Sequence, residues 1–297
     1  MRRPAIGLAV CAQTADLVPA DKAMYALRDV TATVDDIALI ASSIMSKKLA
    51  GGAAAILLDV KTGSGAFMKD LDEARELAEL CVALGEDNGR ASGALITDMS
   101  QPLADAVGNA SEISEAIEVL RGERSGRFAD VCVALAGHMA ALTGLAESGE
   151  QGTELARRAL ASGAALERFR RFVEAQGGDP RIVDDPSLLP QAPVCHELRA
   201  GRDGWLQAVD AEAIGRAAAG VGAGRQRKED EIDLAVGIDF VAAIGDQPGP
   251  DGLVARVLAN DDAAAEAAGR RLLEALTWSE TQVDAPPLIH AVIGSRT

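Results

Sequence analysis

The stretch GGAAAILLDVKTGSGAF, residues 51–67, decides the fold class of this 297-residue chain. Its run AAAILLDV is apolar without a polar face, which is typical of a strand that is covered on both sides. Residues 70–84 then return to helical spacing, and GALITDM at 93–99 indicates a second buried strand. Strands that alternate with helices in this way form parallel sheets, so we expect an α/β portion with a parallel sheet.

The segments on either side of this stretch predict further helices. Upstream, TATVDDIALIASSIMSKKLAGG predicts a helix that Thr33 caps and that ends at Gly51 and Gly52, since a hydroxyl favours a helix start and paired glycines favour its end. Downstream, the chain is rich in alanine and leucine, and helices are expected at residues 112–121, 129–144, 151–162 and 164–176.

A change of composition then divides the chain. The segment GGDPRIVDDPSLLPQAP, residues 177–193, concentrates residues that end helices and mark a domain crossing. Beyond it, helical segments near 211–219 and 261–276 lie among the short strand-like runs VCHEL, GWLQAV, VGIDFVAAI, LVARVL and LIHAVI. We therefore expect a catalytic portion at 1–185 and a smaller α+β C-terminal domain at 190–297.

The composition limits the classes of partner. The formal net charge is −16, so the surface repels a nucleic-acid backbone or an anionic membrane, and we expect neither as a partner. The sequence has no stretch of about 18 apolar residues and no long apolar core of a signal peptide. The cysteines, Cys11, Cys81, Cys132 and Cys195, form no C-x-x-C pair, which argues against a disulfide framework and a zinc knuckle. We expect a cytoplasmic protein.

Ser43 and Lys47 form a polar pair on the first predicted helix. They are four residues apart and are therefore neighbours on one helix face. Lys47 also lies at the edge of the apolar stripe made by Ile37, Ile40 and Ile44. Its ammonium group can point into a pocket wall, or its stem can cover the stripe while the ammonium reaches water. The spacing alone leaves both interpretations open.

The chain resembles the thymidine and pyrimidine-nucleoside phosphorylase family. The resemblance lies in PADKAMYALRDVTATVDDIALIASSIMSKKLA, LLDVKTGSGAFMK, LITDMSQPLADAVGNASEISEAI and GVGAGRQRKEDEID, and it covers essentially the whole chain. It implies a nucleoside-phosphorylase-type fold and a pentosyltransferase. Such an enzyme converts a pyrimidine nucleoside and inorganic phosphate into the free base and (deoxy)ribose 1-phosphate, with phosphate as co-substrate and no other required cofactor.

The resemblance also implies roles for individual residues. The pyrimidine ring is contacted in that family by residues that correspond here to Tyr25, Arg28, Ser43 and Lys47. As the glycosidic bond breaks, the base leaves with negative charge on its ring oxygens, which Arg28 and Lys47 would neutralise as catalytic residues. Ser43 would recognise the ring edge, since a hydroxyl both donates and accepts hydrogen bonds.

A monovalent cation is the second site that the resemblance implies. In the family it is held by backbone carbonyls and one glutamate, which by motif position are Leu103, Ala106 and Glu115. Oxygen ligands suit a hard cation. Without the resemblance, Glu115 would be interpreted as an ordinary acidic residue on a helix surface.

Two glycine-rich segments have competing interpretations. The turn KTGSGAF follows a buried strand and could bind phosphate through its amides, but small residues there more often permit close packing. The flanking Asp59 and Lys61 are interpreted as a structural ion pair. The loop GVGAGRQRKED carries Arg225, Arg227 and Lys228; it is either a solvated loop or, as in the resembled enzymes, a loop that closes over the substrates.

Parts of the family pattern are not found in this sequence. The lysine-histidine-serine-threonine-glycine-glycine phosphate block and the serine-glycine-arginine-glycine signature are missing, so we expect the chain to represent the C-terminal two-thirds of a family member. The full-length protein is expected to be a homodimer, and this chain alone to be inactive. The alternative is a non-catalytic truncated remnant or interaction module that retains the fold.

Overall fold

A computed structural model describes residues 7–10, 17–31, 33 and 36–294 of the chain. Two helices come first, α1 (Pro19–Thr31) and α2 (Ile37–Ala50). The carboxylate of Asp36 caps α2 by accepting a hydrogen bond from the amide of Leu39 at 2.9 Å. The prediction that Thr33 caps this helix is therefore wrong. Thr33 and Asp36 are both good capping residues, and the helix uses Asp36. Helix α1 was not predicted from the sequence.

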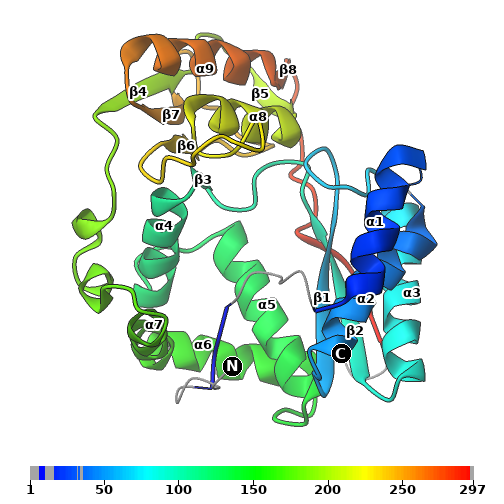
Figure 1. The fold of residues 1–297 in the computed structure, drawn as a ribbon. Coiled ribbons are helices and arrows are strands. Elements are labelled where there is room, and N and C mark those ends of the chain that lie inside the picture. The colour runs from blue at the N-terminus through cyan, green and yellow to red at the C-terminus, as the bar shows by residue number, and fades with distance from the viewer. Residues whose placement is uncertain (1–6, 11–16, 32, 34–35, 295–297) are drawn as a thin grey trace.

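The first sheet has the strand order β1-β2-β9. β1 (Ala55–Thr62) and β2 (Ala91–Asp98) are parallel and are connected by α3 (Leu71–Asp87), as the alternation of strand and helix predicted. β9 (Ile289–Ile293) pairs antiparallel to β2, so the sheet is mixed and the expected all-parallel sheet is corrected. β2 is the central strand and is buried along almost its whole length. Helix α3 lies on one side of the sheet and α5 (Arg127–Leu142) on the other (Figure 1).

The helical region follows the prediction closely. The helices α4 (Ala110–Arg121), α5, α6 (Gly149–Ala161) and α7 (Ala164–Ala175) each lie within two residues of the predicted bounds. Short 3-10 helices at Pro180–Val183 and Pro186–Leu188 then occupy the proline-rich segment. Proline at the first position of each of these turns costs nothing there, because that amide has no partner within the helix.

The C-terminal region forms an antiparallel sheet covered by two helices. The sheet has the order β3-β6-β7-β4, and β5 and β8 form a separate ladder. Its core gathers fully buried side chains such as Ile214, Ile238, Val257 and Leu272. The elements are β3 (Ala106–Gly108), β4 (Val194–Arg199), β5 (Trp205–Val209), α8 (Ala211–Val221), β6 (Gly237–Phe240), β7 (Leu253–Ala259), α9 (Asp262–Glu274) and β8 (Leu276–Ser279).

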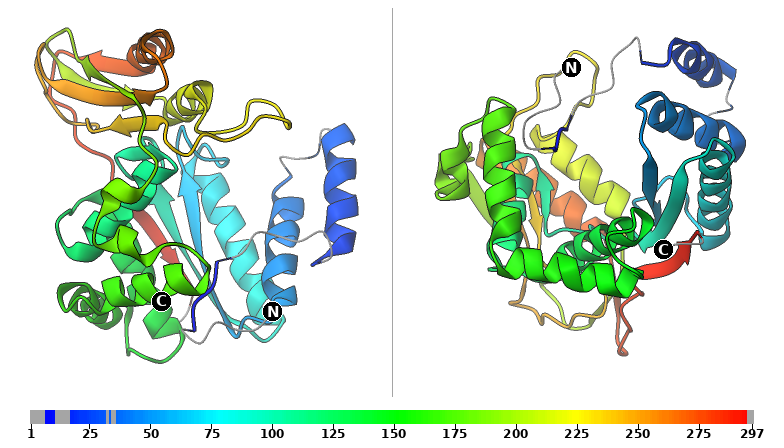
Figure 2. Two further views of the ribbon diagram at one scale, coloured as in Figure 1. Left: turned by 60° about the vertical axis from the view of Figure 1, so that its left-hand side comes forward. Right: turned by 90° about the horizontal axis from the view of Figure 1, so that it is seen from below.

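Each sheet takes a strand from the other side of the predicted boundary. β3 precedes residue 185 but pairs with β6, with Val107 opposite Ile238. β9 follows residue 190 but pairs with β2, with Leu95 opposite Val292. The division into 1–185 and 190–297 therefore follows the order of the chain rather than the membership of the sheets. Figure 2 shows the C-terminal sheet stacked beyond one end of the first sheet, with the connecting segments passing between them.

None of the helices in the described ranges is long and apolar enough to cross a membrane. Cys81, Cys132 and Cys195 are free thiols, and Cys11 lies outside the described residues. Burial raises the pKa of the Cys81 thiol to about 11, so this cysteine is a core residue and not a nucleophile.

Candidate functional site

Arg28 is a buried cation that joins the two N-terminal helices. Arg28 is only 5% exposed. Its Nε donates to the carbonyl of Thr33 at 3.2 Å, and its Nη1 donates to the carbonyl of Leu39 at 3.1 Å. The guanidinium also lies 5.4 Å from the centre of the Tyr25 ring, within the range of a cation–π contact. These contacts fix the guanidinium in the angle between α1 and α2.

Lys47 is held by a triad of polar partners. Its Nζ lies 2.7 Å from Oδ2 of Asp21 on α1, 2.7 Å from Oγ of Ser43 and 2.9 Å from the carbonyl of Ser43. Burial alone would raise the pKa of Asp21, but hydrogen bonds from Lys47 and Ser43 and the charges of Lys47 and Arg28 outweigh it and hold that pKa below 3.8. The ammonium group is therefore ordered beside Ser43, and the snorkelling interpretation does not describe it.

Tyr25, Arg28 and Ser43 help to line a pocket of about 190 Å³, which we call the helix-pair pocket. It combines a cation, a hydroxyl and two aromatic rings, and its lining residues are Tyr25, Arg28, Ile40, Ser43, Ile44 and Phe67. The structure thus brings Tyr25, Arg28 and Ser43 to one pocket, with Lys47 bonded to Ser43. Such a wall suits a flat ring with polar atoms on its edge.

Two residues of this region were missed by the sequence reasoning. Asp21 lies in the quoted segment PADKAMYALR, but its pairing with Lys47 requires α1 to pack on α2. Phe67 ends the turn KTGSGAF and reaches the pocket from the first sheet. The only signal for Phe67 in the sequence was an aromatic residue directly after a glycine-rich turn. In the structure Phe67 is 58% exposed.

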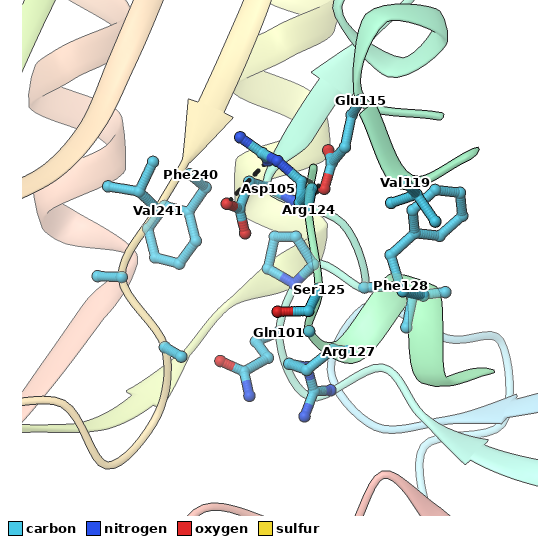
Figure 3. A pocket seen from close by; sticks show the side chains of 16 residues that line it. Gln101, Asp105, Glu115, Val119, Arg124, Ser125, Arg127, Phe128, Phe240 and Val241 are labelled. Atoms are coloured by element: carbon cyan, nitrogen blue, oxygen red, sulfur yellow. Dashed lines mark hydrogen bonds and ion pairs between the residues drawn. The ribbon is translucent and has the colours of Figure 1, made fainter. Parts of the chain in front are cut away.

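Glu115 belongs to α4, and its carboxylate lies in a different region, at the start of β3. Its Oε1 accepts from the amide of Asp105 at 3.2 Å, and its Oε2 accepts from the amide of Ala106 at 2.7 Å. The guanidinium of Arg124 lies 3.2 Å from Oε1 and also pairs with Asp105 (Figure 3). We call Glu115, Arg124, Asp105 and Ala106 the Glu115 corner. Its carboxylate fastens α4 to the strand that joins the C-terminal sheet.

The Glu115 corner contains residues of the predicted cation site. Leu103 and Glu115 line the same cavity of about 190 Å³, and Ala106 donates its amide to Glu115, whereas the prediction concerns the carbonyls of Leu103 and Ala106. The positive charge that faces Glu115 is the guanidinium of Arg124, whose pKa is raised because hydrogen bonding and charge from Glu115 outweigh burial. The monovalent-cation site stays a prediction, and we derive no step through a cation. Among the described residues, no group of three or more His, Cys, Asp or Glu side chains could hold a metal ion.

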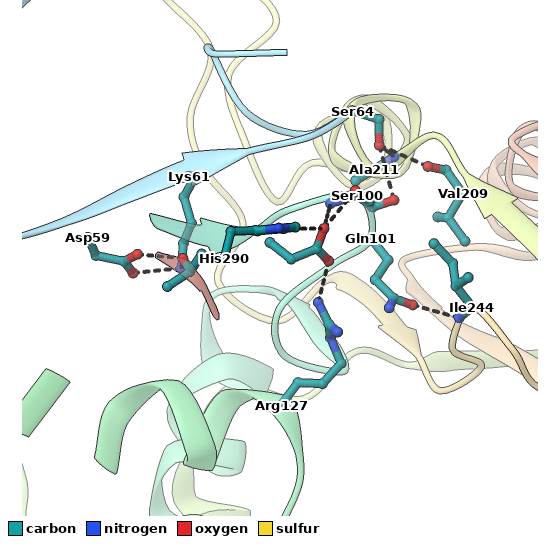
Figure 4. A network of polar contacts seen from close by, with 12 residues as sticks. Asp59, Lys61, Ser64, Ser100, Gln101, Arg127, Val209, Ala211, Ile244 and His290 are labelled. Carbon is teal, nitrogen blue, oxygen red and sulfur yellow. Dashed lines mark hydrogen bonds and ion pairs between the residues drawn. The ribbon is translucent and has the colours of Figure 1, made fainter. Parts of the chain in front are cut away.

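Lys61 forms the structural ion pair that the sequence predicted. Its Nζ lies 2.6 Å from Oδ2 of Asp59 and donates to Oγ1 of Thr97 at 2.8 Å, and Thr97 in turn donates to Asp59 at 2.5 Å (Figure 4). The contacts cross from β1 to β2, so they stabilise the parallel pair. Lys61 does not line the helix-pair pocket, and neither does Lys47, whose contact with it is through Ser43. Lys61 lines a second cavity, of about 420 Å³, that shares Ile40, Ile44 and Phe67 with that pocket.

The glycine-rich turn is a packing element. A Cβ atom at Gly63 would lie 2.6 Å from the amide nitrogen of Ser100, and one at Gly65 would lie 2.8 Å from Cβ of Ala211. The amides of Gly63, Gly65 and Ala66 donate to the carbonyls of Met68, Met99 and Gly63. The close contacts at Gly63 and Gly65 confirm the packing interpretation, and the three bonded amides are not free to bind a phosphate.

The basic loop of the C-terminal domain is closed on itself. Arg225, Arg227 and Lys228 are exposed, while the carboxylate of Asp230 accepts hydrogen bonds from the amides of Gln226 and Arg227 at 3.0 and 2.7 Å. The loop thus presents its cationic side chains to solvent on a turn that Asp230 holds together. This geometry suits attraction of an anion.

Comparisons with known proteins match the chain to two family models. Residues 3–166 match the model of a glycosyl transferase family, a/b domain, and residues 205–279 match that of the pyrimidine nucleoside phosphorylase C-terminal domain. The chain is 48% identical over 283 residues to the pyrimidine-nucleoside phosphorylase of Geobacillus stearothermophilus, and 45% identical over 286 residues to that of Staphylococcus aureus (strain USA300). These matches cover 95% and 96% of this chain but 65% and 66% of the two relatives, so the chain spans about two-thirds of their length.

Proposed function

The chain belongs to the glycosyl transferase family with the pyrimidine nucleoside phosphorylase C-terminal domain, and from this we propose that the protein is a pyrimidine-nucleoside phosphorylase. It would cleave the N-glycosidic bond of thymidine or a related nucleoside with inorganic phosphate, giving the free base and (deoxy)ribose 1-phosphate in nucleoside salvage. Both relatives named above carry this activity in their names.

The observation that carries the proposal is the helix-pair pocket. A pyrimidine has two apolar faces and an edge with carbonyl oxygens and a ring N–H. Tyr25 and Phe67 supply aromatic surface for the faces, and Ser43 supplies a hydroxyl that can pair with the edge. Ile40 and Ile44 give the apolar wall that a ring substituent would meet. The pocket thus offers each kind of contact that the base requires.

The two cations of this region account for the chemistry. Negative charge develops on the ring oxygens as the base departs, and donors that are already oriented toward that charge need no reorganisation. Arg28 is fixed by the carbonyls of Thr33 and Leu39, and Lys47 by Asp21 and Ser43. One such donor is typically worth about 3–4 kcal/mol of barrier lowering. We assign leaving-group stabilisation to Arg28 and Lys47, and the holding of Lys47 to Asp21.

Phosphate, the second substrate, requires donors of its own. The amides of Gly63, Gly65 and Ala66, the nearest glycine-rich candidates, are bonded to carbonyls, and Lys61 is bonded to Asp59 and Thr97. Positioning of a reactant can account for roughly 7–11 kcal/mol of barrier lowering. We therefore propose that this chain binds the pyrimidine but does not by itself catalyse measurable phosphorolysis.

We further propose a cytoplasmic homodimer as the working form. Met24 and Leu27 on helix α1 are 47% and 61% exposed. Exposed apolar side chains on one helix suit a contact with a second copy of the chain. The net charge of −16 disfavours nucleic acid and anionic membranes as partners.

Phosphate-dependent release of free thymine from thymidine tests the proposal. The assay compares this chain with a completed fusion, in which the part of the Geobacillus stearothermophilus relative outside the aligned region is joined to it in that relative's order. We expect robust release by the fusion and none by the chain alone. Release by the chain alone would show that residues described above as structural, Lys61 first, bind phosphate. A folded fusion that neither binds thymine nor releases it would refute the proposed function.

A further inference from the structure

Ser64 joins the glycine-rich turn to the C-terminal domain through its hydroxyl. Its Oγ lies 2.9 Å from the carbonyl of Val209 and 3.1 Å from the carbonyl of Ser100, and it accepts a hydrogen bond from the amide of Ala211 at 3.2 Å. Figure 4 shows the hydroxyl between these backbone groups. The amide of Ala211 belongs to the first turn of α8, where amides have no partner within the helix. Asp210 caps α8 locally by accepting from the amide of Ala213, and Ser64 adds a second capping acceptor from 147 residues away in sequence.

An ion pair lies beside this cap. Nζ of Lys69 donates to the carbonyl of Ser64 at 2.9 Å and to Oε2 of Glu212 at 3.1 Å. Glu212 stands in the first turn of α8, where a carboxylate also favours the helix dipole. Both side chains are well exposed and Glu212 also pairs with Arg216, so the Lys69–Glu212 pair contributes little free energy by itself.

The backbones approach closely at the same point. A Cβ atom at Gly65 would lie 2.8 Å from Cβ of Ala211 and 3.1 Å from the carbonyl of Met99, so a glycine is required for this contact. The hydrogen bonds of Ser64 are part-buried beside this contact, and a cavity of about 620 Å³ lined by Gly65, Lys69 and Glu212 borders it. A polar contact of this kind is specific in both distance and direction.

The turn has a second role in the same structure. Two residues beyond Gly65 it presents Phe67, which forms a wall of the helix-pair pocket. The other walls come from α1 and α2, so the position of Phe67 relative to them depends on how the turn is held. The C-terminal domain is the body against which the turn is held on the side of Ser64.

We propose that Ser64, Gly65, Lys69, Ala211 and Glu212 form a docking latch that holds the turn against α8. Through it, Ser64 acts as a positioning residue for Phe67, and this consequence for the pyrimidine rests on the proposed function. The latch itself is a property of the fold. We expect the glycine-rich turn and the first turn of α8 to lose protection from hydrogen exchange together.

Amide hydrogen exchange of the ligand-free chain tests the latch. The variant Ser64→Ala removes the hydroxyl and leaves the glycines in place. We expect exchange about five- to tenfold faster both at Gly65 and Ala66 and at residues 211–213, the size expected for one lost hydrogen bond, with β2 residues 94–96 unchanged. Unchanged exchange at 211–213, a change on one side of the latch only, or an equal rise at 94–96 would each overturn the proposal.

A charge exchange separates the latch from a general loss of stability. K69E removes the bond to the Ser64 carbonyl and places two carboxylates at the ion pair, so it should raise exchange at residues 211–213, though less than Ser64→Ala does. Because Glu212 also pairs with Arg216, the restoring variant is K69E/E212K/R216E, which should return exchange toward that of the parent chain. The matched control is E197Q, which breaks the exposed Glu197–Arg199 pair on β4 of the same domain and should leave residues 211–213 unchanged. Failure of the triple variant to restore protection would count against the latch.

Calorimetric binding of thymine then tests the consequence for Phe67. Ser64→Ala should weaken thymine binding at least threefold, while E197Q should not. If the parent chain binds no thymine, the proposed function fails and the exchange results still decide the latch. If the parent binds thymine and Ser64→Ala binds it equally well, the positioning role is refuted.

Discussion

Lys47 and Lys61 are nearly identical by local measures and differ in what surrounds them. Their side chains are 23% and 22% exposed, and each forms an ion pair with an aspartate, at 2.7 and 2.6 Å. Lys47 is bonded to Ser43, which lines the helix-pair pocket, whereas Lys61 is bonded to Thr97 on the neighbouring strand. Ion pairing and burial therefore do not separate these two lysines. The proposed site role of Lys47 rests on the partner beyond the ion pair, Ser43, which lines the pocket.

The same contrast distinguishes the helix-pair pocket from the Glu115 corner. Both were located by resemblance, and both hold a nearly buried charged residue, Arg28 or Glu115, each 5% exposed. Each borders a cavity of about 190 Å³, but both oxygens of Glu115 are bonded to backbone amides. We propose the first region as a ligand site, whereas the contacts of the second join α4 to β3.

The largest effect is expected at the helix-pair pocket. In the completed fusion, Lys47→Ala or Arg28→Ala should lower kcat/KM for thymidine by about a hundredfold or more, the size expected when a charged donor to the leaving group is lost. Lys47→Ala is the cleaner variant, because Arg28 also joins α1 to α2. The matched control, Lys61→Ala, should stay within about threefold of the parent. Near-normal turnover by both pocket variants would remove the distinction between the two lysines.

The Glu115 corner should show the opposite behaviour. Glu115→Gln should lower the free energy of unfolding by about 1–3 kcal/mol, because one amide or the guanidinium of Arg124 loses its acceptor inside the protein. Thymine binding by the chain should not change. Urea unfolding and calorimetry measure the two quantities. A variant of normal stability whose activity in the fusion loses a dependence on potassium would support the cation interpretation.

Two glycines, Gly65 next to α8 and Gly215 within it, differ in the space that an added Cβ atom would find. Gly65→Ala should destabilise the chain by about 1–3 kcal/mol, since its Cβ would press on Ala211 and on the carbonyl of Met99. Gly215→Ala, within α8 and with open space around it, should stabilise by about 0.5–1 kcal/mol through helix propensity. Thermal unfolding of the two variants provides the measurement. Equal shifts of Tm in the same direction would contradict the close approach at Gly65.

Local patterns in the sequence predicted most elements but not how distant ones meet. The apolar run of β2 correctly indicated a buried strand, whereas that of β1, which was predicted to be covered on both sides, leaves Leu57 and Leu58 half-buried and Asp59 exposed. LIHAVI was correctly predicted as a strand, yet its pairing with β2 joins Val292 to Leu95, and no spacing rule links residues so far apart. Helix α1 received no prediction although its apolar residues recur at helical spacing, and two of them, Met24 and Leu27, are exposed in the structure.

The candidate site shows the same division. The spacing of four residues correctly placed Ser43 beside Lys47, and the structure confirms their contact at 2.7 Å. Asp21 and Phe67 were not found, since each reaches the site from another element after folding. The capping role of Ser64 for α8 was also invisible, because a cap is normally sought next to its own helix. Tertiary packing supplied each of these residues.

The smallest effect concerns the pH dependence of the Asp21–Lys47 pair. The pKa of Asp21 is held below its ordinary value of 3.8, so the folded state favours the carboxylate more than the unfolded state does. Its stabilising contribution is therefore present above that value and is lost as the pH falls through the folded pKa. We expect the parent chain to exceed Asp21→Asn in unfolding free energy by about 1 kcal/mol or less at pH 6, and by less still at pH 3. Urea unfolding of both proteins across this range measures the difference, and Asp179→Asn, at an exposed pair with Arg181, serves as the comparison. A difference between parent and Asp21→Asn that stays constant from pH 6 to pH 3 would mean that the carboxylate charge does not hold Lys47, and the order of the ammonium would then have to come from Ser43 alone.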